Sequence, residues 1–294
     1  MKLLITGGTG KIGENLIKKL LQSNEIKIRV LVKKEESCFK DSKIEIIKGN
    51  LLDLNSLFKA TKNIDIVLHL AGITHTNKKE LYFKINTIGT QNLLKASEKN
   101  NVKKFIYISS RTACEQGGEY GQSKFFAEKN VQEYKNNWII LQLAEVYGAG
   151  KKEAISRLIN LIKKNYLIPI IGNGQYLLSP VFIDDIVNVI INSVKYDNIY
   201  KKKYVIAGPE EISYIDIIDY LVSILKLKRL KIFIPLFIVR FLTYLLYILN
   251  INFVVRDQIP RLLCKKPINI DAAKVDLNFN PCKFENGIKK IIQE

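Results

Sequence analysis

The fold is decided by the stretch KLLITGGTGKIG, residues 2–13. Its first five residues are mostly apolar, which predicts a short buried strand over 2–6. Residues 14–22 then carry leucine and isoleucine on one helical face, so four glycines, three of them in the spacing GxxGxxG, lie between a strand and a helix. In such a turn Gly7 makes the tight bend, Gly10 lets the backbone approach a pyrophosphate, and Gly13 lets the helix pack on the strand. The stretch therefore predicts a dinucleotide-binding turn, whose phosphates would lie at the helix N-terminus.

Strand-like and helix-like segments continue to alternate along the chain. Further strands are predicted over 28–32, 44–48, 65–70, 104–109, 138–143 and 203–207, and helices over 80–100 and 123–134. This alternation is typical of an α/β protein with a doubly wound parallel sheet, here a Rossmann sheet of about seven strands. Ligands bind such sheets at the carboxyl ends of the strands.

The end of the second predicted strand bears on the choice of cofactor. An acid at this tip usually binds the ribose 2′-hydroxyl of NAD. Here the strand ends in Lys33 and Lys34, and Glu35 and Glu36 come only afterwards. Two lysines suit a 2′-phosphate, so the sequence slightly favours NADP over NAD; the alternative is a pair of solvated lysines.

A tyrosine and a lysine stand four residues apart after the fifth predicted strand. Tyr120 and Lys124 form a YxxxK pattern, and residues i and i+4 share one face of a helix. A phenol with a pKa of about 10 is a poor acid or base at neutral pH unless a nearby cation stabilises the phenolate. Lys124 can supply that cation and reach the cofactor ribose as well.

With these motifs the chain resembles the extended short-chain dehydrogenase/reductases, the NAD-dependent epimerase/dehydratase family. The resemblance rests on TGGTGKIG (6–13), HLAG (69–72), KINTIGTQNLL (84–94), FIYISS (105–110), GEYGQSKFFAEK (118–129), AEVYGAG (144–150), VFIDDIVNVI (181–190) and the tail 269–287. These segments are spread over most of the chain.

The resemblance implies a role for each matching residue. Tyr120 would be the general acid/base, and Lys124 would bind the nicotinamide ribose. Asn86 would support the proton relay. The implied cofactor-binding residues are Gly7, Gly10, Lys11, Ile12, Gly13, Lys33, Asn50, Leu51, Ala71, Gly72, Asn86, Ser109, Tyr120 and Lys124.

Two departures from the family pattern concern the site. The residue that usually supplies a catalytic hydroxyl after the fifth strand is Arg111 here, so Ser110 or Thr112 must serve. Family dehydratases carry an Asp-Glu pair at this point, and Arg111-Thr112 cannot replace it. The sequence therefore disfavours 4,6-dehydration.

The family's organisation implies a discontinuous division of the chain. Residues 1–148 plus 181–208 would form the NAD(P)-binding Rossmann domain, and 149–180 plus 209–294 a smaller C-terminal substrate-binding lobe. Arg256 and Arg261 lie where the family tail often lines the substrate site, and could bind a substrate diphosphate or form plain salt bridges.

The most apolar run of the chain covers residues 232–249, but Pro235 and Arg240 interrupt it. A central arginine costs about 2.5–3.5 kcal/mol in a membrane span. We expect first a helix buried in the lobe or against a partner subunit. The alternative is an interfacial helix with basic flanks drawn to anionic lipid.

The net charge of +18 suggests nucleic acid at first sight, but only seven of the 46 basic residues are arginine. Because arginine is the residue suited to bidentate phosphate and base contacts, a nucleic-acid partner is disfavoured.

Four scattered cysteines and two histidines predict no metal site. No signal peptide is recognised, so the expected location is the cytoplasm, at most peripheral to the inner membrane face.

These observations together predict an NAD(P)-dependent oxidoreductase or epimerase, with NAD or NADP as cofactor. The substrate would be a small molecule, a nucleotide-activated or lipid-linked sugar. A reductase or dehydrogenase of a non-sugar alcohol or ketone, and a non-catalytic NADPH-binding accessory subunit, remain as alternatives. The family also implies a possible homodimer.

Overall fold

The fold is built on a parallel sheet of seven strands. The structure, a computed structural model, describes residues 1–294 except 24, 34–38, 40, 151–152, 249–257 and 294. The strands are β1 (Lys2–Thr6), β2 (Lys27–Val32), β3 (Ile44–Lys48), β4 (Ile66–His69), β5 (Lys104–Ser110), β6 (Asn137–Leu143) and β11 (Lys202–Ile206). They lie in the order β11-β6-β5-β4-β1-β2-β3, and every neighbouring pair is parallel. The predicted doubly wound Rossmann sheet is confirmed, with the strand order reversing at β1.

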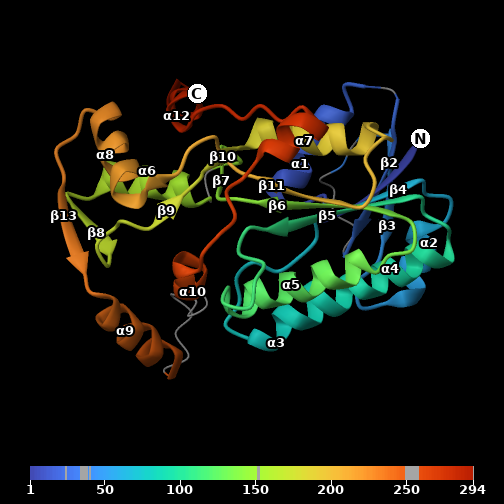
Figure 1. The fold of residues 1–294 in the computed structure, drawn as a ribbon, viewed down its shortest axis with the longest axis horizontal. Coiled ribbons are helices and arrows are strands. Elements are labelled where there is room, and N and C mark those ends of the chain that lie inside the picture. Colours follow the sequence, from blue (N-terminus) through green and yellow to red (C-terminus); the bar gives the residue numbers. More distant parts are fainter. Residues whose placement is uncertain (24, 34–38, 40, 151–152, 249–257, 294) are drawn as a thin grey trace.

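Helices cover both faces of the sheet (Figure 1). One face carries α1 (Lys11–Leu20), α7 (Ile183–Lys195) and α11 (Asp271–Leu277). The other carries α2 (Leu54–Thr61), α4 (Gly89–Lys99) and α5 (Gly118–Gln132). Because both faces are covered, the central strands are apolar throughout: Leu3, Leu4 and Ile5 of β1 are all completely buried.

The remaining elements gather beyond the carboxyl ends of β5 and β6 (Figure 1). They are β7 (Val146–Tyr147), α6 (Ala154–Lys164), β8 (Leu167–Ile171), β9 (Leu177–Leu178), β10 (Val181–Phe182), β12 (Ile212–Ser213), α8 (Tyr214–Ile224), β13 (Leu230–Ile234), α9 (Leu236–Ile248), α10 (Gln258–Leu263) and α12 (Phe284–Gln293). Three strand pairs connect them, β7 with β10, β8 with β13, and β9 with β12. The division into a Rossmann domain and a substrate lobe stays a prediction.

Several predicted element boundaries were wrong. The helix predicted over 123–134 begins at Gly118, so Tyr120 lies in its first turn. The helix predicted over 80–100 is built as α3 (Lys79–Tyr82), a π-helical turn η1 (Phe83–Ile88) and α4. The predicted strands 65–70 and 203–207 differ by one residue at their ends.

The apolar run 232–249 is not one helix. Its beginning belongs to β13, which pairs in parallel with β8, and α9 starts only after Pro235. Proline has no N–H to continue a ladder and a fixed φ that suits the start of a helix, which explains the change of structure at this point. The helix is not buried within this chain, because Phe237 is 72% exposed and Phe241 64%, whereas burial against a partner subunit stays a prediction. Among the residues that the structure describes, no helix is long and apolar enough to cross a bilayer.

Candidate active site

The glycine-rich turn joins β1 to α1 in a conformation that only glycine accepts. Gly7 has φ +74°, and a Cβ there would lie 2.6 Å from the backbone nitrogen of Ala71. A Cβ on Gly13 would lie 2.5 Å from the carbonyl oxygen of Gly7, so α1 packs directly on the turn. Gly10, in contrast, has only the Gly7 oxygen near its missing Cβ, at 3.2 Å.

The N-terminus of α1 is open toward this turn. Gly10 is the N-cap, and no side chain caps the helix, which begins with Lys11 and Ile12. Free N–H groups and a helix dipole favour an anion at such a place. The turn thus fits a pyrophosphate. Gly7 and Gly13 permit the close packing, and Gly10 leaves room above the backbone.

The predicted adenine side lies at the end of β3. Asn50 is exposed, and its Oδ1 accepts a hydrogen bond from the N–H of Leu52 at 3.1 Å. Leu51 is buried, and its carbonyl accepts from Asn92 at 3.0 Å. Lys33, at the end of β2, is exposed, whereas Lys34, Glu35 and Glu36 lie outside the described residues. One lysine of the predicted 2′-phosphate site is therefore placed at a strand tip.

The segment after β4 is held by one amide. Ile73 donates its N–H to Oδ1 of Asn86 at 2.8 Å, and the amide nitrogen of Asn86 donates to the Ile73 carbonyl at 3.0 Å and to Ser123 Oγ at 3.0 Å. Asn86 thus ties the chain just after Ala71 and Gly72 to the catalytic helix α5. It lies in η1, and π-helical turns are frequent at functional sites.

Lys124 is buried on α5, four residues after Tyr120. Its Nζ donates to the carbonyl of Ile108 at 2.7 Å and lies 4.1 Å from the centre of the Tyr107 ring. Burial lowers the pKa of the Lys124 ammonium to about 7, although the carboxylate of Glu128 acts in the opposite direction. The lysine therefore changes its charge near neutral pH.

This pKa predicts a proton uptake on cofactor binding. At about pH 8 most Lys124 side chains are neutral. An anionic dinucleotide whose ribose accepts a hydrogen bond from the Lys124 ammonium favours the charged form of the lysine. Binding should then take up a large fraction of a proton, and the uptake should fade below pH about 7, where Lys124 already carries its proton. Calorimetric binding in buffers of different ionisation enthalpy measures it. Lys124→Met should abolish the uptake and Lys129→Gln should keep it; a binding enthalpy independent of buffer contradicts the prediction.

Three hydroxyls at the end of β5 and just after it have different surroundings. Ser110 Oγ and Thr112 Oγ1 lie 2.9 Å apart and share a hydrogen bond. Ser109 is buried, and its Oγ donates to Glu128 Oε1 at 2.5 Å. The side-chain amide of Gln142 donates to the same oxygen. Ser110 and Thr112 therefore remain together as candidates for the active-site hydroxyl, while the side chain of Ser109 is occupied in the core.

Arg111 belongs to a buried ion cluster between the sheet and the lobe. Its Nη2 lies 2.9 Å from Glu145 Oε2, and its Nη1 donates to Ser179 Oγ at 3.1 Å. Lys266 approaches the other oxygen of Glu145 at 3.2 Å. Burial alone would raise the pKa of Glu145, but Lys266 and Arg111 lower it below its usual value. Arg111 thus ties the end of β5 to Glu145 and Ser179 instead of supplying a hydroxyl.

Arg261, on α10, lies against Tyr120, the tyrosine predicted to be the acid/base. Its guanidinium carbon is 4.0 Å from the centre of the Tyr120 ring, and it donates to Thr74 O at 2.8 Å and to Tyr82 Oη at 2.9 Å. The rings of Tyr82 and Tyr120 meet edge to face at 5.9 Å. The sequence suggested Arg261 for the substrate site, but neither this stacking nor Tyr82 could be read from it. Arg256 lies outside the described residues.

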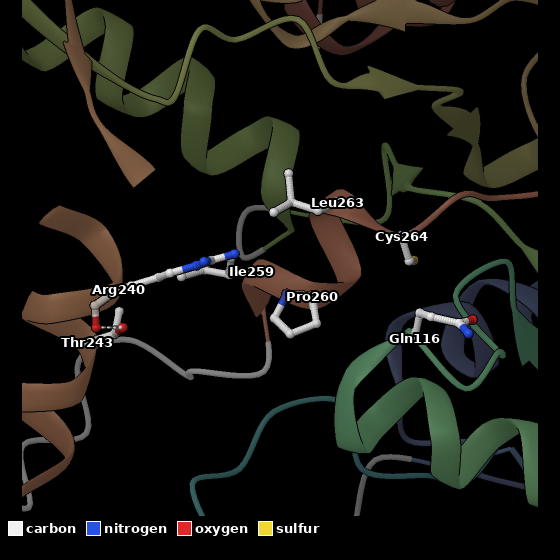
Figure 2. A pocket seen from close by; sticks show the side chains of 7 residues that line it. All are labelled: Gln116, Arg240, Thr243, Ile259, Pro260, Leu263 and Cys264. Atoms are coloured by element: carbon white, nitrogen blue, oxygen red, sulfur yellow. Dashed lines mark hydrogen bonds between the residues drawn. The ribbon is translucent and has the colours of Figure 1, made fainter. Parts of the chain in front are cut away.

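A cavity of about 540 Å³ opens beside this group, between α9, α10 and the loop before α5. Arg240 and Thr243 line it from α9, Ile259 from α10, and Gln116 from the loop. The side chain of Arg240 extends from α9 toward Ile259 (Figure 2). The cavity is therefore bounded by both an apolar helix and the segment that carries Arg261.

The two histidines have different surroundings. His69 is completely buried, with Thr6 at 2.6 Å and Thr90 at 3.0 Å on its two ring nitrogens, and burial lowers its pKa to about 3. It is a core residue between β1, β4 and α4. Burial lowers the pKa of His75 too, with Arg261 and Arg157 adding to the effect. These arginines make the space around His75 electropositive.

Comparison with known proteins decides the family. A model of the NAD dependent epimerase/dehydratase family matches residues 3–207. The chain belongs to this family. It is 24% identical over 318 residues to a UDP-glucose 4-epimerase of Vibrio cholerae, covering 99% of this chain and 94% of that protein. It is 29% identical over 273 residues to a dTDP-D-glucose 4,6-dehydratase of Dictyostelium discoideum, covering 76% of this chain and 62% of the relative.

A solved structure confirms the fold of this family member. The UDP-glucuronic acid 4-epimerase from Bacillus cereus, in complex with UDP-glucuronic acid and NAD, superposes with a TM-score of 0.79 at 23% identity. The match covers 98% of this chain and 97% of that chain. This likeness concerns the fold, and the family assignment drawn from the motifs is confirmed by the family model over residues 3–207.

Proposed function

We propose that this family member is an NAD(P)-dependent epimerase or oxidoreductase of a sugar carried on a diphosphate. The observation that supports it best is the start of α5, where Tyr120 lies against Arg261 and the buried Lys124 follows four residues later on the same helix. The glycine turn would hold the pyrophosphate of the cofactor, and Asn86 would keep the segment of Ala71 and Gly72 against α5. Bound NAD(P) would supply a hydride acceptor and donor.

In this proposal Tyr120 moves the proton of the reacting sugar hydroxyl. Lys124, when charged, stabilises the phenolate and donates to the cofactor ribose. Ser110 or Thr112 donates to the same sugar oxygen. The electropositive space near Arg157 and Arg261 suits the diphosphate of a nucleotide- or lipid-linked sugar.

Two further observations bear on reaction and cofactor. The residues after β5 include Arg111 bound to Glu145, and not the acidic pair of a dehydratase, which supports epimerisation or oxidation over 4,6-dehydration. The Bacillus cereus epimerase binds NAD, while Lys33 at the β2 tip would suit NADP. The NADP preference stays a prediction, as does the homodimer, for which Ile88 and Phe126 are exposed apolar side chains on η1 and α5.

Turnover with defined substrates tests the function. The purified chain is incubated with NAD or NADP and with UDP- and dTDP-hexoses or a polyprenyl diphosphate sugar, and the products are separated by chromatography and identified by NMR. We expect a C4 epimer or an oxidised sugar, without a 4-keto-6-deoxy product. Tight cofactor binding without conversion of any diphosphate sugar contradicts the proposal and favours a non-sugar reductase or an accessory subunit.

A further inference from the structure

An apolar face covers β13 and α9 at the end of the molecule farthest from the sheet edge formed by β3 (Figure 1). Its exposed side chains, here called the β13–α9 face, include Leu230, Ile232, Phe233, Phe237, Phe241 and Leu242. They are between 45% and 72% exposed. Soluble monomers rarely expose so many large apolar groups side by side, and such a patch marks a surface that binds something.

The periodicity of α9 excludes an ordinary core helix. Thr243, a polar residue, is buried and lines the cavity with Arg240, whereas the phenylalanines of the helix point outward. Scattered exposed residues such as Val275 occur on any protein and need no partner. Here the exposed residues are contiguous along a strand and the helix that comes after it. Leu236, Val239 and Thr243 are the less exposed side of the helix, and its remaining described side chains, most of them large and apolar, are exposed to solvent.

Most charges around this face are positive. From Lys226 to Arg256 the sequence contains six basic residues and no aspartate or glutamate. Lys226 and Lys228 are exposed just before β13. Lys163 and Lys164 are exposed at the end of α6, which leads into β8, the partner of β13. The apolar face therefore has a basic rim, interrupted only where Lys231 pairs with Asp219 among the residues that the structure describes.

We propose that the β13–α9 face docks on an anionic lipid bilayer. A basic rim around exposed phenylalanines matches a negatively charged interface, whereas two copies of the same face would bring like charges together. The thirteen residues of α9 span about 20 Å, too short to cross a membrane, so the helix lies along its surface. The cavity between α9 and α10 then lies next to the lipid, beside the helix that carries Arg261.

Vesicle co-sedimentation of the full chain tests this surface. The chain should bind vesicles that mix phosphatidylglycerol with phosphatidylcholine, and bind pure phosphatidylcholine far less; added salt should weaken the anionic binding. Phe237→Ser with Phe241→Ser should reduce binding at least about ten-fold, since two aromatic rings no longer enter the interface. The matched control, Tyr200→Ser with Val275→Ser, replaces two exposed residues elsewhere and should bind like the parent.

The rim is tested separately. Lys226→Gln with Lys228→Gln should weaken binding about five-fold for each lysine, and Lys27→Gln with Lys48→Gln should not. These lysines all lie at the surface, so the unfolding midpoints of both variants should match that of the parent. Absence of binding to anionic vesicles at low salt, or equal binding of the phenylalanine variant, overturns the proposal. A dimer that dissociates only in that variant, without vesicle binding, would make the face a self-interface instead.

Discussion

Replacing Tyr120 by phenylalanine should lower kcat by about 10²–10⁴-fold. The change removes only the hydroxyl that would take and return the proton of the sugar. The ring keeps its edge-to-face contact with Tyr82 and its place under the guanidinium of Arg261, so the local packing is preserved. The glycine turn is untouched, and the affinity for the cofactor should stay near that of the parent.

Rapid-mixing and steady-state kinetics, with a separate titration of the cofactor, measure the two quantities independently. Tyr200→Phe is the control, because Tyr200 is an exposed surface residue that should not affect turnover. A Tyr120→Phe enzyme with unchanged kcat would assign the acid/base role to another residue. If the Tyr120→Phe variant loses cofactor affinity as well as kcat, the Tyr120 hydroxyl also binds the dinucleotide, and proton transfer is not its sole role.

Alanine at two neighbouring glycines should separate folding from cofactor binding. In Gly13→Ala the new methyl would lie 2.5 Å from the Gly7 oxygen and 2.7 Å from the Gly8 Cα, both backbone atoms that cannot turn aside. We expect a loss of about 3 kcal/mol in the free energy of unfolding and a Tm lower by about 10 °C.

Gly10→Ala should behave in the opposite way. Its φ of −79° is normal for alanine, and its methyl would meet only the Gly7 oxygen, at 3.2 Å, a tight contact that a backbone shift of a few tenths of an ångström relieves, so Tm should fall much less than in Gly13→Ala. The methyl would stand where a pyrophosphate must approach the backbone, so dinucleotide affinity should fall at least about ten-fold. Thermal unfolding and calorimetric binding of both variants measure this. Normal affinity in Gly10→Ala would show that the phosphates do not lie over this turn.

Much of the redox site could be predicted because its determinants are local in sequence. The glycines of the β1–α1 turn are required by backbone geometry within seven residues, and Tyr120 and Lys124 share a helix face by their spacing alone. The start of α5 was placed too late, since Gly117 and Gly118 resemble a loop. In the structure Gly117 is the N-cap of α5, and a Cβ there would lie 2.1 Å from the carbonyl oxygen of Thr112.

Long-range contacts settled the questions that local patterns left open. From the sequence, Arg111 only replaced an expected hydroxyl; in the structure it pairs with the carboxylate of Glu145, 34 residues away, whose other oxygen binds Lys266. Whether 232–249 is buried depended on β8, which takes the first part of the run as a strand and leaves α9 on the outside. The net charge of +18 says nothing of where the charges lie, and only the fold gathers some of them around an apolar face.

The sequence by itself determined the Rossmann sheet, the dinucleotide turn and the Tyr120–Lys124 pair. Their causes are alternation of apolar segments, the absence of a Cβ, and helical spacing, all of which act over a few residues. The tertiary structure alone decided that Lys124 titrates near neutral pH, that Arg261 stacks on Tyr120, and that the phenylalanines of α9 face solvent. Each of these depends on burial or on contact between segments far apart in the chain, which no local pattern encodes.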